Sequence, residues 1–151
     1  MPPADPALAR LLPHRGTMCL LDTIESASPE RIACRASSHR AADHPLRVNG
    51  RLPALVAIEY AAQAMAAHGG LAAARDGADA APGFLVAVRD VRLHVDTLDA
   101  LGDDLLVRAT RLAAGAGGLV YAFEVSAGTR KVAEGRATVA LRAADKPQAG
   151  G

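Results

Sequence analysis

Apolar residues recur along this chain with two different spacings, one typical of strands and one typical of helices. In residues 30–37 every second side chain is apolar, which is the period of a half-buried strand. Residues 18–27 form a second strand candidate just before it, and Ser28 and Pro29 between them predict a turn. Residues 5–12 predict a short helix, because a proline follows directly and ends it.

The middle of the chain carries one long apolar segment. We expect a helix over residues 53–75, with Pro53 at a natural first helical position. Gly69 and Gly70 predict a break or bend in its last turns. No charged stripe runs along this segment before Arg75, so the helix is apolar on nearly every side and must be buried on most of them.

Four more strand candidates follow the helix. They are expected at residues 83–95, 104–113, 118–127 and 131–142. A change of phase near Arg89 and Asp90 predicts a bulge in the first of them. Short glycine-containing gaps separate the last three, which predicts two hairpins.

This order of elements, a short helix, two strands, a long helix and four strands, predicts an α+β fold. A helix lying on one face of an ordinary sandwich would normally carry a charged outer stripe, and this one does not. An antiparallel curved sheet wrapped around one long buried helix satisfies the pattern, and that arrangement is the hot-dog fold. We expect residues 1–143 to form a single domain and residues 144–151 a disordered tail.

Composition excludes several classes of function. Lys and Arg number 17 against 16 Asp and Glu, so the chain lacks the broad positive field that nucleic-acid binding needs. Aromatic residues make up only 3%, which removes the usual base-stacking platform. No apolar run has the length or purity of a signal peptide or a membrane span, so we expect a cytoplasmic protein without membrane contact.

The two cysteines are expected to be reduced. If residues 19–27 and 30–37 pair about the predicted turn, Cys34 lies opposite Thr23. Cys19 would then be roughly 13 Å from Cys34 at the usual rise along a strand. A disulfide requires Cα atoms within about 7 Å, so both thiols should stay free, as is usual in the cytoplasm.

One charged residue interrupts the apolar helix, and it is a carboxyl. Glu59 is the only charge in residues 53–67, and an isolated carboxylate is expensive to bury. Gln63 follows four residues later and therefore lies on the same face. The pair suits general acid–base chemistry. A structural carboxyl that caps a loop or bonds to Tyr60 or Gln63 is the alternative.

The loop before the helix adds the other parts of an acid–base site. His44 has the side chain that most readily exchanges a proton near neutral pH, and His39 is a second candidate base. The backbone amides of Ala54 and Leu55 begin the helix, where they could hold a carbonyl oxygen as it gains charge. These parts predict removal of a proton α to a thioester, although a solvated loop histidine is the alternative for His44.

Two segments resemble a known family. Residues 11–22, Leu-Leu-Pro-His-Arg-Gly-Thr-Met-Cys-Leu-Leu-Asp, resemble the Leu-Pro-His-Arg opening of bacterial β-hydroxyacyl-acyl-carrier-protein dehydratases. Residues 44–47 and 53–64 are similar to the His-Phe-Pro-Gly loop of these enzymes and the Glu…Ala-Gln-Ala helix after it. The resemblance is greatest to the dehydratase-like proteins of aryl-polyene and related pigment clusters, and it covers roughly residues 9–70.

The resemblance implies an activity and a site. It implies dehydration of β-hydroxyacyl thioesters to trans-2-enoyl thioesters, in fatty-acid-like or aryl-polyene biosynthesis. His44 would take the α-proton and Glu59 would protonate the departing hydroxyl. Ala54, Leu55 and Gln63 would bind the substrate or its oxyanion. No metal or redox cofactor is expected, because eliminating water transfers no electrons.

The resemblance also implies partners. The substrate would arrive on the phosphopantetheine arm of an acyl carrier protein. The family's active site lies between two subunits, with the histidine from one chain and the glutamate from the other, which implies a homodimer or a heterodimer with another hot-dog subunit. Candidate docking charges for an acidic carrier protein are Arg40, Arg47, Arg51, Arg89 and Arg92.

Two other functions stay open at this stage. A hot-dog thioesterase would use Glu59 to activate water. A non-catalytic subunit would complete the site of another hot-dog protein. This alternative stays open because Pro-Leu-Arg follows His44 where the family has Phe-Pro-Gly, and because the spacing from His44 to Glu59 is one residue longer than in the family.

Overall fold

The computed structural model describes residues 8, 11–12, 18–77, 83–115 and 117–141. Six strands form one antiparallel sheet in the order β1-β2-β4-β5-β6-β3. The strands are β1 (Thr23–Ala27), β2 (Arg31–Ala36), β3 (Gly83–Leu93), β4 (Leu105–Gly115), β5 (Gly118–Ala127) and β6 (Arg130–Leu141). The helices are η2 (Ser38–Arg40), η3 (Ala54–Val56) and α2 (Ala57–Arg75).

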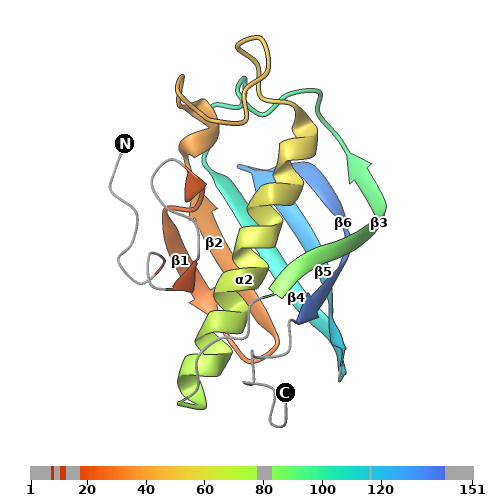
Figure 1. The fold of residues 1–151 in the computed structure, drawn as a ribbon. Helices are drawn as coiled ribbons and strands as arrows, with labels where there is room; N and C mark the ends of the chain where they lie inside the picture. The colour runs from red at the N-terminus through yellow and green to blue at the C-terminus, as the bar shows by residue number, and fades with distance from the viewer. Residues whose placement is uncertain (1–7, 9–10, 13–17, 78–82, 116, 142–151) are drawn as a thin grey trace, which may run out of the picture.

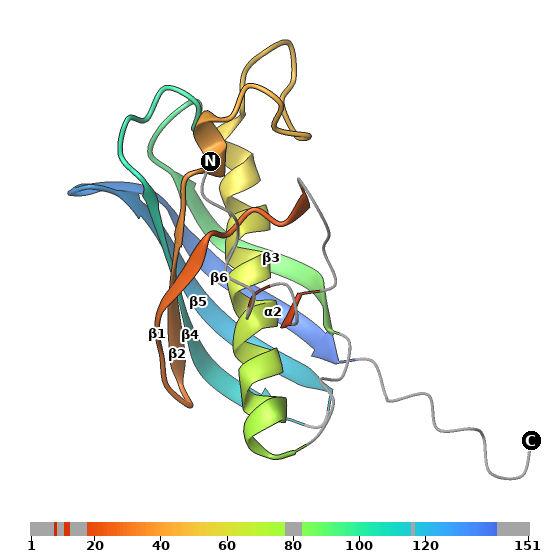
Figure 2. The same ribbon diagram turned by 90° about the vertical axis from the view of Figure 1, so that its left-hand side faces the viewer.

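The long helix α2 lies across the concave face of the curved sheet (Figures 1 and 2). Its inward side is lined by small residues and by Tyr60, and these pack against inward side chains of β2, β4 and β5 such as Ile32, Val107 and Val125. The predicted hot-dog fold is confirmed. In the described part of the chain, no helix combines the length and apolar character that crossing a bilayer requires.

The first strand is shorter than predicted. It begins at Thr23 and not at residue 18, because the preceding backbone bonds to a side chain in place of a neighbouring strand. The Gln63 amide on α2 accepts the Leu20 N–H at 2.8 Å and donates to the Met18 carbonyl at 2.6 Å. The segment before β1 is thereby tied to the helix.

The residue predicted to lie opposite Cys34 in the β1–β2 pair, Thr23, was wrong by one position. The β1–β2 turn closes with the Ser28 N–H bonded to the Arg31 carbonyl, and a bulge then shifts the register, so Cys34 lies opposite Ile24. Both cysteines are free, as predicted. Burial raises the pKa of the Cys34 thiol to about 12, which keeps it protonated and unreactive near neutral pH.

The glycine pair does not break the helix, contrary to the prediction. α2 continues through Gly69 and Gly70 to Arg75. A Cβ at Gly70 would come within 2.9 Å of Leu11 Cδ2, so the glycine allows the N-terminal segment to approach the helix closely. The predicted bulge in β3 is confirmed, since Asp90 has a φ of +55° where the pairing with β6 changes register.

Two predictions fall wholly or largely outside the described residues. The short helix at residues 5–12 is described only at Leu8, Leu11 and Leu12, and the tail at residues 144–151 is not described.

A buried histidine ties the far half of α2 to the sheet. His68 Nε2 donates to the Ser28 carbonyl at 2.9 Å, and Nδ1 accepts the Tyr121 hydroxyl at 2.7 Å. One imidazole thus joins the helix, the β1–β2 turn and β5.

We predict that Tyr121→Phe lowers the free energy of unfolding by about 1–2 kcal/mol, because His68 Nδ1 would lose its hydrogen-bond donor in the core. Urea denaturation of the variant and the parent measures the difference. An unchanged midpoint would show that this hydrogen bond contributes nothing to stability.

Candidate active site

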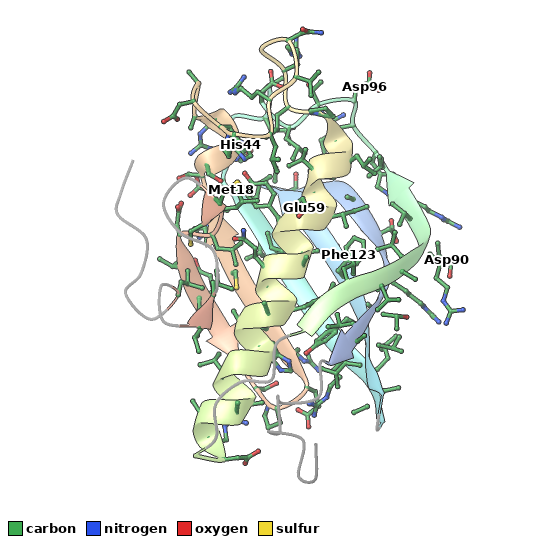
Figure 3. All side chains as sticks on the ribbon, viewed as in Figure 1. Met18, His44, Glu59, Asp90, Asp96 and Phe123 are labelled. Carbon is green, nitrogen blue, oxygen red and sulfur yellow. The ribbon has the colours of Figure 1, made fainter. Side chains whose placement is uncertain are left out.

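Glu59 lies in the first turn of α2 and is exposed, so the expected burial of this carboxyl is wrong for the single chain. Figure 3 places it on α2, in front of the sheet. The sheet covers only one side of the helix, and the sequence does not reveal which side remains open. Among the described residues, no hydrogen bond or ion pair reaches the Glu59 carboxylate. The Glu59 carboxylate is therefore accessible to a molecule that binds on this side of α2.

The surroundings of Glu59 are apolar. Leu55, one turn earlier, is 60% exposed, and Ile58, Ala62 and Ala66 are half-buried. Helical spacing places Leu55, Ala62 and Ala66 on the same side of α2 as the carboxylate. A carboxylate in an open apolar stripe becomes desolvated once a partner covers the stripe, which is the condition that favours proton transfer by a carboxyl.

His44 is buried, with only 6% of its surface exposed. Its Nε2 lies 3.1 Å from the Tyr60 hydroxyl, and its Nδ1 accepts the Leu46 N–H at 3.1 Å. Burial lowers the pKa of His44, and the positive charge of Arg47 lowers it further. This histidine is therefore a neutral group at physiological pH.

The structure does not bring His44 and Glu59 together within one chain. Tyr60 follows Glu59 directly, and consecutive positions on a helix point about 100° apart. Tyr60 is accordingly buried and bonded to His44, while Glu59 is exposed. The catalytic pair expected from the sequence is incomplete in a single chain.

The helix N-terminus offers a different amide from the first one expected. The Ala54 N–H donates to the Asp96 carbonyl at 3.0 Å, beside a bridge between Pro53 and Thr97, so it is occupied. The Leu55 N–H has no acceptor among the loop and side-chain contacts of the described residues. Leu55 is therefore the better oxyanion donor of the two candidates.

Gln63 is buried, and both ends of its amide bond to the backbone of Met18 and Leu20. Its expected contact with substrate stays a prediction, and the geometry gives it a structural role. Sequence reasoning missed Ser38 as a site residue. The place of Tyr60 beside Glu59 indicates only that the two side chains point in different directions, and the structure alone shows that Tyr60 faces the core.

His39, the second candidate base, is fully buried in η2. Its Nε2 donates to the Leu101 carbonyl at 3.1 Å, and no hydrogen bond is found for its Nδ1 within the described part of the chain. Burial is the main cause that lowers the pKa of His39.

We predict that the free energy of unfolding falls as the pH drops below about 6.5, the ordinary pKa of histidine. Below this pH His39 takes up a proton in the unfolded chain, whereas burial lowers its pKa in the folded protein and keeps it neutral. The lowered pKa of His44 has the same effect on stability. Urea midpoints between pH 7.5 and 5 measure the slope. His39→Gln should flatten the slope. Equal slopes in the parent and in His39→Gln would contradict the assignment.

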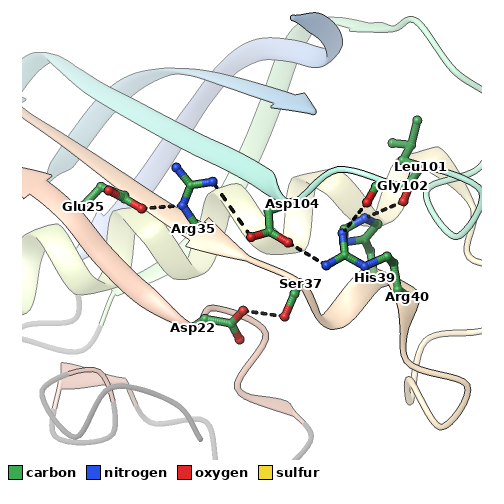
Figure 4. Close-up of polar contacts among 9 residues, drawn as sticks. All are labelled: Asp22, Glu25, Arg35, Ser37, His39, Arg40, Leu101, Gly102 and Asp104. Carbon is green, nitrogen blue, oxygen red and sulfur yellow. Dashed lines mark hydrogen bonds and ion pairs between the residues drawn. The ribbon is translucent and has the colours of Figure 1, made fainter. Parts of the chain in front are cut away.

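Three of the five candidate docking arginines are engaged within the chain. Arg40 bonds to Asp104 and the Gly102 carbonyl (Figure 4). Arg47 donates to two loop carbonyls, and Arg51 pairs with Asp99 at 3.0 Å.

Figure 4 also shows Arg35 between Glu25 and Asp104, which ties β1, β2 and the loop before β4 together. Arg89 and Arg92 are exposed, and no ion pair is found for either within the described residues. These two on β3 are the docking candidates that remain uncommitted.

The sequence matches the model of a protein family described as ApeP-like, ApeP dehydratase, over residues 6–149. The chain belongs to the ApeP-like dehydratase family. This confirms the resemblance to the dehydratase-like proteins of aryl-polyene clusters, and it supports a hydro-lyase in general terms. No curated protein matches the sequence at a significant level.

Solved structures agree with the fold. The dehydratase heterocomplex ApeI:P from Xenorhabdus doucetiae has a chain that is 25% identical, with 91% of each chain covered and a TM-score of 0.79. AziG from S. sahachiroi is 24% identical, with 89% of this chain and 100% of that chain covered and a TM-score of 0.59. A hypothetical thioesterase from Streptococcus pneumoniae, solved with coenzyme A, is 15% identical over 79% of this chain and 84% of that chain, with a TM-score of 0.55.

Proposed function

We propose that this chain is a cytoplasmic subunit of a two-subunit hot-dog dehydratase that converts β-hydroxyacyl thioesters to trans-2-enoyl thioesters, with Glu59 as the general acid. The observation that carries the proposal is the exposed Glu59 carboxylate, which lies in an open apolar stripe one turn after Leu55. Within the described residues, neither this carboxylate nor the Leu55 N–H has a partner among the loop and side-chain contacts. Family membership supports the same reaction class.

The open side of the molecule supports a second hot-dog subunit as the partner. Strand β3 is an edge of the sheet, and an unpaired edge strand is a ready template for pairing. It carries four exposed apolar side chains, Leu85, Val86, Val88 and Leu93. The similar ApeP-type chain belongs to a heterocomplex, which favours a heterodimer here over a homodimer.

The chemistry follows from the groups available. A base removes the proton α to the thioester, and the Leu55 amide stabilises negative charge on the thioester oxygen. The electron pair forms the α,β double bond as the β-hydroxyl leaves, and Glu59 supplies the proton that makes water of it. Glu59 recovers a proton from solvent or from the protonated base. No electrons are transferred, so the reaction as proposed requires no redox cofactor.

The substrate is proposed to be bound to an acyl carrier protein through phosphopantetheine. Arg89 and Arg92 on β3 are exposed and provide positive charge for docking an acidic carrier. Because both arginines are exposed, the electrostatic attraction should weaken as salt rises.

The test is to mix the purified chain with a β-hydroxyacyl carrier protein, alone and with a second hot-dog subunit from the same source, and to follow the acyl group by mass. Loss of one water supports the proposal. Release of free acid and thiol would replace it with a thioesterase, and an inert mixture in every combination would refute it.

A further inference from the structure

A chain of hydrogen bonds runs from the Leu20 carbonyl through Ser38 and Tyr60 to His44. This chain fixes which ring nitrogen of His44 carries the proton. The Ser38 hydroxyl lies 2.7 Å from the Leu20 carbonyl and 2.6 Å from the Tyr60 hydroxyl. A carbonyl only accepts, so the single proton of Ser38 goes to Leu20. Ser38 must then accept the proton of Tyr60, and the Tyr60 oxygen is left only as an acceptor.

The acceptor role of Tyr60 dictates the state of His44. With its proton already directed to Ser38, the Tyr60 oxygen can only receive a proton from His44 Nε2 at 3.1 Å. The other ring nitrogen, Nδ1, faces the Leu46 N–H, which is a donor, so Nδ1 must carry the lone pair. The ring is thus neutral, protonated at Nε2, and its one lone pair is already engaged.

A base needs a free lone pair that faces the substrate, and His44 has none in this arrangement. Protonating Nδ1 would set two N–H groups against each other. The nearby charges act in the same direction, because Arg47 opposes a positive ring more strongly than Asp43 favours one, and His39 also opposes it. The engaged Nδ1 lone pair and the positive charge of Arg47 both prevent His44 from accepting a proton from substrate.

We infer that Ser38 and Tyr60 are positioning residues that hold His44 as an inactive neutral tautomer, so that the composite site to which His44 belongs does not turn over substrate. This rests on the proposed function. A heterodimer of hot-dog subunits would have two possible composite sites. The site containing Glu59 is active, and the site containing His44 is silent.

The first test reads the tautomer directly and needs no activity. Full-length protein labelled with ¹⁵N in histidine is examined by long-range ¹H–¹⁵N correlation from pH 8 to 5, with His44→Asn used to assign the signals. We expect an Nε2–H pattern for His44 throughout. Tyr60→Phe removes the acceptor of that proton, so the pattern should become mixed or the ring should titrate. Tyr121→Phe is the matched control, because it alters a similar bond at His68 and should leave His44 unchanged.

An Nδ1–H pattern, or an imidazolium that forms near neutral pH in the parent protein, would overturn the inference. A Tyr60→Phe protein in which His44 is unaltered would also overturn it, since Tyr60 would then not position the ring. Circular dichroism shows whether each variant is folded, and the parent spectrum decides the tautomer even if a variant is not.

The second test measures turnover of the assembled pair. His44→Asn should change kcat less than about threefold, whereas the partner's base should be essential. A loss of 100-fold or more in a folded His44→Asn pair would refute the silent site while leaving the dehydratase intact. If the parent pair is itself inert, the proposed function fails, and the NMR result still decides the state of His44.

Discussion

Glu59→Gln lowers kcat for dehydration by about 10²–10⁴-fold, the contribution typical of a positioned general acid. The amide keeps the size and hydrogen bonding of the side chain but has no proton to give to the leaving hydroxyl. Because Glu59 is exposed and has no partner among the described residues, the substitution should not change the fold. Stopped assays that follow the enoyl product by mass measure the loss in the complex with the second subunit.

The matched control is Glu30→Gln, which makes the same change at an exposed position before β2. It should retain full activity and the same melting temperature. If Glu59→Gln turns over substrate as fast as the Glu30→Gln protein, Glu59 is not the acid. A loss of kcat/KM that comes only from a raised KM would indicate a binding role.

Gln63→Met lowers the free energy of unfolding by about 2–4 kcal/mol, because it leaves the Leu20 N–H and the Met18 carbonyl without their partner at a buried position. Methionine has nearly the same length and volume, so lost packing contributes little. Urea denaturation at pH 7.5 measures the change. An exposed control, Glu30→Met, should stay within about 0.5 kcal/mol of the parent.

The same variant separates the two roles considered for Gln63. If the amide only anchors residues 18–20, the folded fraction of Gln63→Met keeps its kcat and KM. A stable variant with strongly raised KM would restore the substrate contact expected from the sequence and would argue against the anchoring role.

The fold was accessible from the sequence because it depends on periodicity. Strands β2 and β5 and the long helix follow from two-residue and helical spacing of apolar side chains, and their bounds agree closely with the structure. The strand before β2 was predicted too long, because a side chain 43 positions away takes its hydrogen bonds. Contacts so distant in the sequence leave no local pattern.

The sequence by itself determined that one carboxyl interrupts an apolar helix behind a histidine-bearing loop, and that the pattern belongs to a hot-dog dehydratase. The tertiary structure decided the orientation of those groups. Glu59 and Tyr60 are neighbours in the chain, yet helical geometry sends one to the open surface and the other to Ser38 and His44 in the interior. Periodicity encodes which residues face a core, whereas the donors and acceptors that meet there are set by three-dimensional packing.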